Sequence, residues 1–160
     1  MKICDIALIN PRDKLKDNSF INYIDTSSVN DGKLQEIQYL TSNFPSRAQR
    51  VVKMNDILIS SVRPNLKHNY MVNVDKDNLI ASTGFIQIRC NSNKVLPQYV
   101  YYFLSSDKRT KMYSMIADSS QTTYPSFNKE VIESLELEDI SIESQQHIVN
   151  TISSLLLKSF

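Results

Sequence analysis

The chain has 160 residues, of which 41% are hydrophobic and 22% charged, a composition typical of one globular domain. Its only two glycines, Gly32 and Gly84, cannot form the glycine-rich loops that bind dinucleotides or nucleoside triphosphates. The net charge of +1 is an average, because residues 46–94 carry eight basic and three acidic residues while residues 130–160 carry one basic and six acidic residues. The basic middle suits a polyanion, and the acidic end suits a different partner.

The first half of the chain reads as short strands joined by turns. Strands are predicted at residues 20–24, 50–52, 56–62, 70–74 and 85–90. Asp31-Gly32 predicts a turn with positive φ, and Asn55 takes a turn position that glycine often fills. Pro64 ends the strand predicted at residues 56–62, because proline donates no ladder hydrogen bond.

The second half reads mainly as helices. Helices are predicted from Pro97, over residues 107–116, over residues 128–133 and from about Ile142, with a polar loop at 117–124 and a strand at 135–137. Ser141 is a suitable N-cap for the last helix. Strands followed by helices indicate the α+β class, with a single mainly antiparallel twisted sheet, flanking helices and a C-terminal amphipathic helix.

Few residues suit metal or nucleophilic chemistry. Cys4, Cys90, His68 and His147 lie far apart, so the four clustered ligands of a structural zinc site are not expected. A Cys–His pair stays open, because such partners meet only in the fold. No apolar run approaches the length of a membrane span, and the first nine residues do not resemble a signal peptide.

Three segments carry most of the chemical information. The first runs from Pro45-Ser46-Arg47-Ala48-Gln49-Arg50 to a strand that ends Ser61-Val62-Arg63-Pro64-Asn65, and its arginines suit phosphate or guanine edges. The second is the corner Ala81-Ser82-Thr83-Gly84-Phe85, where we expect Gly84 to adopt positive φ. The third is the polar loop Ser119-Ser120-Gln121-Thr122-Thr123-Tyr124-Pro125.

Together with the Tyr99-Val100-Tyr101-Tyr102-Phe103-Leu104 helix and Glu143-Ser144-Gln145-Gln146-His147-Ile148, these segments resemble one half of a known protein family. The chain is similar to a target-recognition domain of the specificity (S) subunit of type I restriction–modification systems. The resemblance extends over nearly the whole chain. It departs from the family at Ser141-Ile142, which replace a Leu-Pro pair, and in having one domain where a full S subunit has two.

The resemblance implies a non-catalytic protein without a cofactor or metal, which reads one half of a split DNA sequence. It implies a recognition domain over residues 1–140 and the start of a spacer or dimerisation helix over residues 141–160. The residues expected to contact DNA are Arg47, Arg50, Arg63, Asn65 and Lys67, with Gln121, Thr122 and Tyr124 on the polar loop. The residues expected to form the pairing seam are Ile148, Ile152 and Leu155.

The partners that the resemblance implies are double-stranded DNA, a DNA methyltransferase (modification) subunit and, through the complex, a restriction subunit. We also expect self-association or pairing with a second recognition half. The expected location is the cytoplasm, with no membrane among the partners. The alternative is an interaction adaptor that does not bind DNA and docks through its C-terminal helix. A third reading, an enzyme in its own right, predicts that the chain binds S-adenosylmethionine, which we do not expect.

Overall fold

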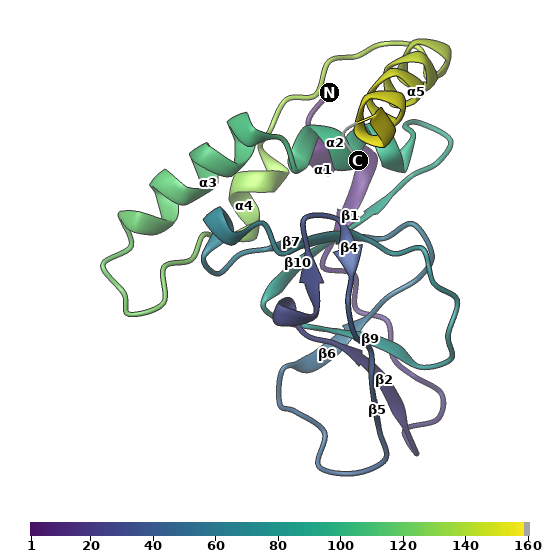
Figure 1. Ribbon diagram of the computed structural model, residues 1–160, viewed down its shortest axis with the longest axis vertical. Helices are drawn as coiled ribbons and strands as arrows, with labels where there is room; N and C mark the ends of the chain where they lie inside the picture. The colour runs from purple at the N-terminus through teal and green to yellow at the C-terminus, as the bar shows by residue number, and fades with distance from the viewer. Residues whose placement is uncertain (159–160) are drawn as a thin grey trace.

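Three layers of secondary structure stack in the computed structural model, which describes residues 1–158 (Figure 1). Helices cover one face of a first four-stranded sheet, and a second four-stranded sheet packs toward its other face. The first sheet has the order β1 (Ala7–Ile9), β10 (Phe85–Cys90), β7 (Ile57–Ser60), β8 (Asn69–Met71). The second has the order β5 (Gln38–Leu40), β2 (Ile21–Ile24), β9 (Leu79–Ser82), β6 (Ala48–Val51).

The remaining elements are short turns and the helical layer. A two-stranded ribbon of β3 (Val29–Asn30) and β4 (Lys33–Leu34) follows the 3₁₀ turn η1 (Thr26–Ser28), and a second 3₁₀ turn, η2 (Pro64–Leu66), follows β7. The helices are α1 (Ile3–Ile6), α2 (Pro97–Leu104), α3 (Asp107–Asp118), α4 (Lys129–Glu133) and α5 (Ile142–Lys158). The last two residues of the helix predicted at 141–160 lie outside the described residues.

The central strand β7 explains how the layers are held together. Ile57 and Ile59 are buried in the core beneath the helices, while Leu58 points the other way into the core between the two sheets. Complete burial of an aliphatic side chain contributes about 1.5–3 kcal/mol. A strand with both faces buried therefore reads as a continuous apolar run and not as an alternating one.

The structure confirms the α+β class and the mainly antiparallel pairing, since β2 and β9 form the one parallel strand pair among the described residues. The expectation of a single sheet is wrong, because the strands divide between two four-stranded sheets and a ribbon. Sequence periodicity predicts strands but not which of them pair. It also missed β9, the strand that joins β2 to β6.

Most predicted elements are found close to their expected limits, including α5 with its Ser141 cap, which accepts a hydrogen bond from Ser144 N at 3.1 Å. The strand predicted at 135–137 is reduced to one bridge, between Lys2 and Glu136. Residues 135–137 pair only with the first residues of the chain, through hydrogen bonds from Ile3 N to Leu135 O and from Leu137 N to Met1 O.

The turn predictions have different outcomes. Gly32 (φ 88°) and Asn55 (φ 71°) adopt the expected left-handed conformation. The positive φ expected at Gly84 is wrong. A Cβ atom at Gly84 would lie 2.8 Å from Thr26 Cγ2, so glycine is needed there because η1 approaches closely.

Candidate nucleic-acid interface

Four segments far apart in the sequence meet along one edge of the molecule, and we call them the polar ridge: residues 46–50, 61–67, 82–85 and 119–127. Backbone hydrogen bonds join them. Thr83 N donates to Arg47 O at 2.9 Å, and Ser61 N donates to Gly84 O at 2.9 Å. Phe127 N donates to Ser61 O at 3.1 Å. The three segments singled out in the sequence therefore lie side by side.

Two predicted DNA-contacting arginines come from the start of β6 but have different surroundings. A β-bulge shifts the pairing of β6 with β9 between Ala48 and Arg50, and bulges redirect side chains. Arg47 is exposed in the turn before the strand. Arg50 is half-buried, and its Nε donates to Phe85 O at 2.7 Å. Arg47 is thus presented to solvent, whereas Arg50 also holds the corner in place.

Arg63 is an exposed cation of the ridge that lies between the basic loop and the polar loop. It is exposed, it adopts left-handed φ (46°), and its guanidinium lies 5.7 Å from the centroid of the Tyr124 ring. Its amide donates to Pro125 O at 2.9 Å, beside a bridge between Val62 and Ser126. The basic loop and the polar loop therefore form one surface.

The other residues predicted in the basic loop flank η2. Lys67 follows η2 in left-handed φ (53°), and its Nζ forms an ion pair with Asp107 at the start of α3. Hydrogen bonding to Asp107 raises the pKa of Lys67. Asn65 is exposed beside a hollow of about 490 Å³ that Lys111 and Ser114 of α3 also line. Asn65 is therefore available to a ligand, while the charge of Lys67 is already partly compensated.

The polar loop follows α3, at the left of Figure 1 below the outer end of that helix. Gln121 and Thr122 are exposed, and Gln121 adopts positive φ (53°). Thr122 Oγ1 donates to Tyr124 O at 2.9 Å, which orders the turn before Tyr124. The three polar-loop candidates thus lie on the exposed side of the ridge.

The predicted pairing seam is divided between the core and solvent. Ile148 and Ile152 are half-buried, because α5 packs on α2 and buries Val149. Leu155 is 60% exposed, and Leu156 is 49% exposed. The middle of α5 thus packs on the domain's own core, while its last turns carry leucine side chains into solvent.

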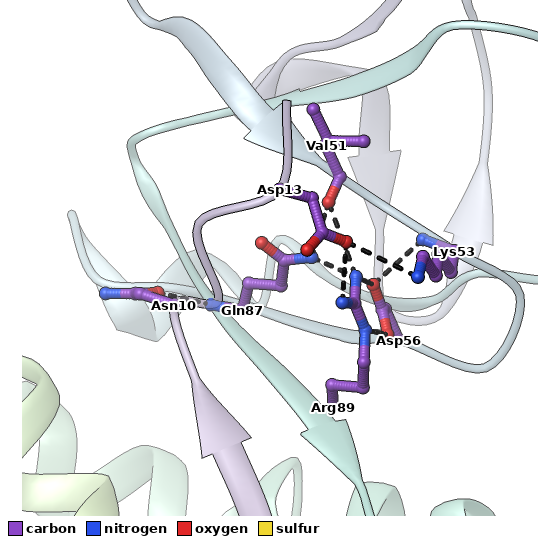
Figure 2. Close-up of polar contacts among 7 residues, drawn as sticks. All are labelled: Asn10, Asp13, Val51, Lys53, Asp56, Gln87 and Arg89. Carbon is purple, nitrogen blue, oxygen red and sulfur yellow. Dashed lines mark hydrogen bonds and ion pairs between the residues drawn. The ribbon is translucent and has the colours of Figure 1, made fainter. Parts of the chain in front are cut away.

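Sequence reasoning missed a buried polar network between the two sheets (Figure 2). Asp56 is 1% exposed and pairs with Arg89 of β10, whose Nη2 lies 2.8 Å from Asp56 Oδ2. Gln87 Nε2 donates to Asp56 Oδ2 at 2.8 Å and to Val51 O of β6 at 2.9 Å. Asp13 pairs with Arg89 from the N-terminal segment. The network fixes the end of β6 relative to β7 and thereby the two arginine-bearing parts of the ridge.

A second missed residue is Gln145 in the first turns of α5. It is fully buried, its Oε1 accepts from Leu96 N at 2.9 Å, and its Nε2 donates to Ile140 O at 3.1 Å. The amide therefore supplies hydrogen-bond partners to two backbone groups outside the helices' own ladders, one at the start of α2 and one in the loop before α5. The signal available in the sequence was a polar residue on the predicted inward side of an amphipathic helix, which indicates a buried hydrogen-bonding side chain.

The buried thiol of Cys90 does not suit nucleophilic chemistry. Burial raises the pKa of Cys90 to about 12, which disfavours the thiolate that a nucleophile requires. His68 Nδ1 lies 2.7 Å from Val29 O. Within residues 1–158, no group of three or more metal-ligating side chains gathers, and no helix is long and apolar enough to cross a membrane.

Comparison with known proteins decides the family. The family model for the type I restriction modification DNA specificity domain matches residues 1–159. The chain belongs to this family.

Relatives of this specificity domain support the assignment. This chain is 33% identical over 134 residues to the type I restriction enzyme HindI specificity subunit of Haemophilus influenzae. The alignment covers 83% of this chain and 29% of the relative. The crystal structure of the HsdS subunit from Thermoanaerobacter tengcongensis is similar with a TM-score of 0.83, at 26% identity, over 99% of this chain and 42% of that one. A chain from a structure described as the basis of complex assembly and conformational transition of the type I R-M system gives a TM-score of 0.84, at 25% identity.

The specificity domain therefore spans less than half of the proteins that it matches, 29% of the curated relative and 42% of each solved subunit. Its residues 1–158 hold one α+β fold, with α5 as the last of the described helices.

Proposed function

We propose that this specificity domain is a sequence-specific DNA-recognition module of a type I restriction–modification methyltransferase complex. It reads one half of a bipartite site and positions the methyltransferase subunits, while a restriction subunit joins through the complex. It has no catalytic activity and no cofactor of its own, and it works in the cytoplasm. The membership of its family and the exposed cations of the polar ridge support this proposal.

Residues 1–140 form the recognition domain in this proposal, and residues 141–160 begin the spacer or dimerisation helix. The contacts with DNA come from Arg47, Arg50, Arg63, Asn65 and Lys67, together with Gln121, Thr122 and Tyr124. Arg63 is the strongest candidate, because it is exposed, carries no ion pair among residues 1–158 and lies over Tyr124. Lys67 is the weakest, because Asp107 already compensates its charge.

The helix α5 joins this module to a second recognition half or a second copy of the chain. Ile148, Ile152 and Leu155 share one side of the helix, and the seam emerges from the core at Leu155. An isolated helix of 17 residues is only about 25 Å long, so pairing needs the support of the domain on which it lies.

The convergence of Arg47, Arg63 and the polar loop on one ridge is the observation that carries the proposal. The chain, assembled with the methyltransferase subunit, is titrated with a duplex library at several salt concentrations. We expect selective binding that weakens steeply with salt, because neutralised phosphates release counterions. Binding of the methyltransferase subunit without any affinity for duplex DNA would favour the adaptor reading, since docking through an apolar seam responds little to salt.

A further inference from the structure

A hollow of about 320 Å³ opens beside the polar ridge, between β6, the end of β7 and the start of α4. Its walls are mostly polar. Arg50, Ser61 and Thr83 line it from the ridge, and Asn128 and Lys129 line it from the α4 side. None of the α4 residues was a candidate in the sequence.

Arg50 supplies the hollow with an uncompensated charge. Its Nε donates to Phe85 O and its Nη2 to Thr83 O, and no carboxylate within residues 1–158 forms an ion pair with it. Burial lowers the pKa of the Arg50 guanidinium, which reflects the loss of water around the charge. A half-buried cation without a counter-charge gains stability when an anion occupies the adjoining space.

Lys129 brings a second cation to the same hollow. Its side chain is 45% exposed, and its Nζ lies 3.3 Å from Glu133 Oε1 in an i,i+4 pair that is worth only a few tenths of a kcal/mol. The ammonium group can therefore exchange this carboxylate for an anion in the hollow. The exposed Glu130 also lies at the rim, and its charge opposes an anion.

We propose that this hollow binds one phosphate group of the DNA backbone, held between the Arg50 guanidinium and the Lys129 ammonium group. The inference rests on the proposed function and adds α4 to the contact surface. A guanidinium fork with a second cation matches the geometry of a phosphate, and the hydroxyl groups of Ser61 and Thr83 suit its oxygens. The contact fixes the register of the domain on the duplex without reading a base.

The test compares the full chain with Lys129→Gln and Glu130→Gln, neighbouring substitutions that remove opposite charges from one rim. Arg50 is left unchanged, because it holds the corner carbonyls. Duplex affinity is measured from 50 to 200 mM salt. We expect Lys129→Gln to weaken binding and to flatten the slope of log K against log salt by up to about 0.9, the value for one phosphate contact that is lost completely. Glu130→Gln should bind at least as tightly as the unchanged chain.

A second arm identifies the source of the phosphate. Methylphosphonate replaces one backbone phosphate at a time, and one position should weaken binding of the unchanged chain clearly more than binding of Lys129→Gln, which keeps only Arg50 at that phosphate. Saturation by inorganic phosphate without any such position would assign the hollow to the free ion and overturn the proposal. Duplex binding with an unchanged slope in Lys129→Gln would overturn it while leaving the proposed function intact. Failure of the unchanged chain to bind any duplex would remove both.

Discussion

Among single residues, Arg63 and Lys67 differ in whether a carboxylate already compensates their charge. Arg63 is exposed over Tyr124, whereas Lys67 is paired with Asp107. Both adopt left-handed φ, which asparagine tolerates well, so Arg63→Asn and Lys67→Asn remove the charge without straining the backbone. We expect Arg63→Asn to weaken duplex binding about tenfold and Lys67→Asn about threefold or less, as measured by fluorescence anisotropy.

Urea denaturation of both variants provides the control. Exposed positions outside the core change stability by about 0.5 kcal/mol or less, so both variants should unfold close to the unchanged chain. Equal losses of affinity in the two variants would contradict the assignment of Arg63 as the leading contact.

Asp13 makes part of the stability dependent on pH. A hydrogen bond from Arg89 lowers the pKa of Asp13, with further attraction from Lys53. The ionised carboxylate therefore stabilises the fold at neutral pH, and this contribution is lost as the pH falls through the lowered pKa. We expect Asp13→Asn to be less stable than the unchanged chain at pH 7 and nearly equal to it at about pH 2, in urea denaturation at each pH. A difference that is the same at both pH values would contradict this role.

Between elements, the network of Figure 2 joins β10, the end of β6 and the turn before β7. Arg89→Met leaves Asp56 buried without its cation, and removal of one partner from a buried pair costs about 3–5 kcal/mol. We expect a loss at the lower end of this range, because the Arg89 side chain is 19% exposed. Lys53→Met is the matched control, since its ion pair with Asp13 is 3.5 Å long and its side chain is 65% exposed.

The attachment of α5 to the domain depends on Gln145. Its substitution by alanine leaves Leu96 N and Ile140 O without their partners, and we expect a loss of about 2–3 kcal/mol in the free energy of unfolding. Gln146→Ala is the control, because Gln146 is exposed and its Nε2 donates to Asn150 Oδ1 on the same helix. Similar losses for the two variants would contradict a special role of the buried amide, since alanine is the better helix former at both positions.

The same elements show which parts of the structure the sequence could predict. Periodicity predicted β10 and α3 correctly, because each alternates or repeats over six residues or more. It missed β9, since four buried residues ending in Ala81-Ser82 have no alternation to detect. Arg50 lies within the ridge, but its half-buried position depends on a β-bulge that no local pattern predicts. The partners of Asp56 lie more than thirty residues away, so only the fold brings them together.

For the whole molecule, the ridge assembles four segments from separate parts of the chain. Residues 47, 63, 83 and 124 reach one edge only after both sheets and α3 are in place, through contacts such as Thr83 N to Arg47 O and Arg63 N to Pro125 O. A surface of this kind depends on the relative position of the layers. The core between the sheets, with Leu58 and Phe85, therefore holds the parts of the proposed contact surface together.

The last turns of α5 expose leucine side chains, and their effect belongs to the scale of the whole molecule. Leu155 continues the side of Ile148 and Ile152, whereas Leu157 lies about 200° further around the helix. If the seam pairs two copies, Leu155→Asp should raise the dissociation constant of self-association about tenfold or more, because it places a charge in an apolar contact. Leu157→Asp adds the same charge outside the seam and should change it about twofold or less. Sedimentation velocity over a range of concentrations measures both constants. A chain that is monomeric throughout, or equal effects of the two variants, would show that α5 does not pair through this side.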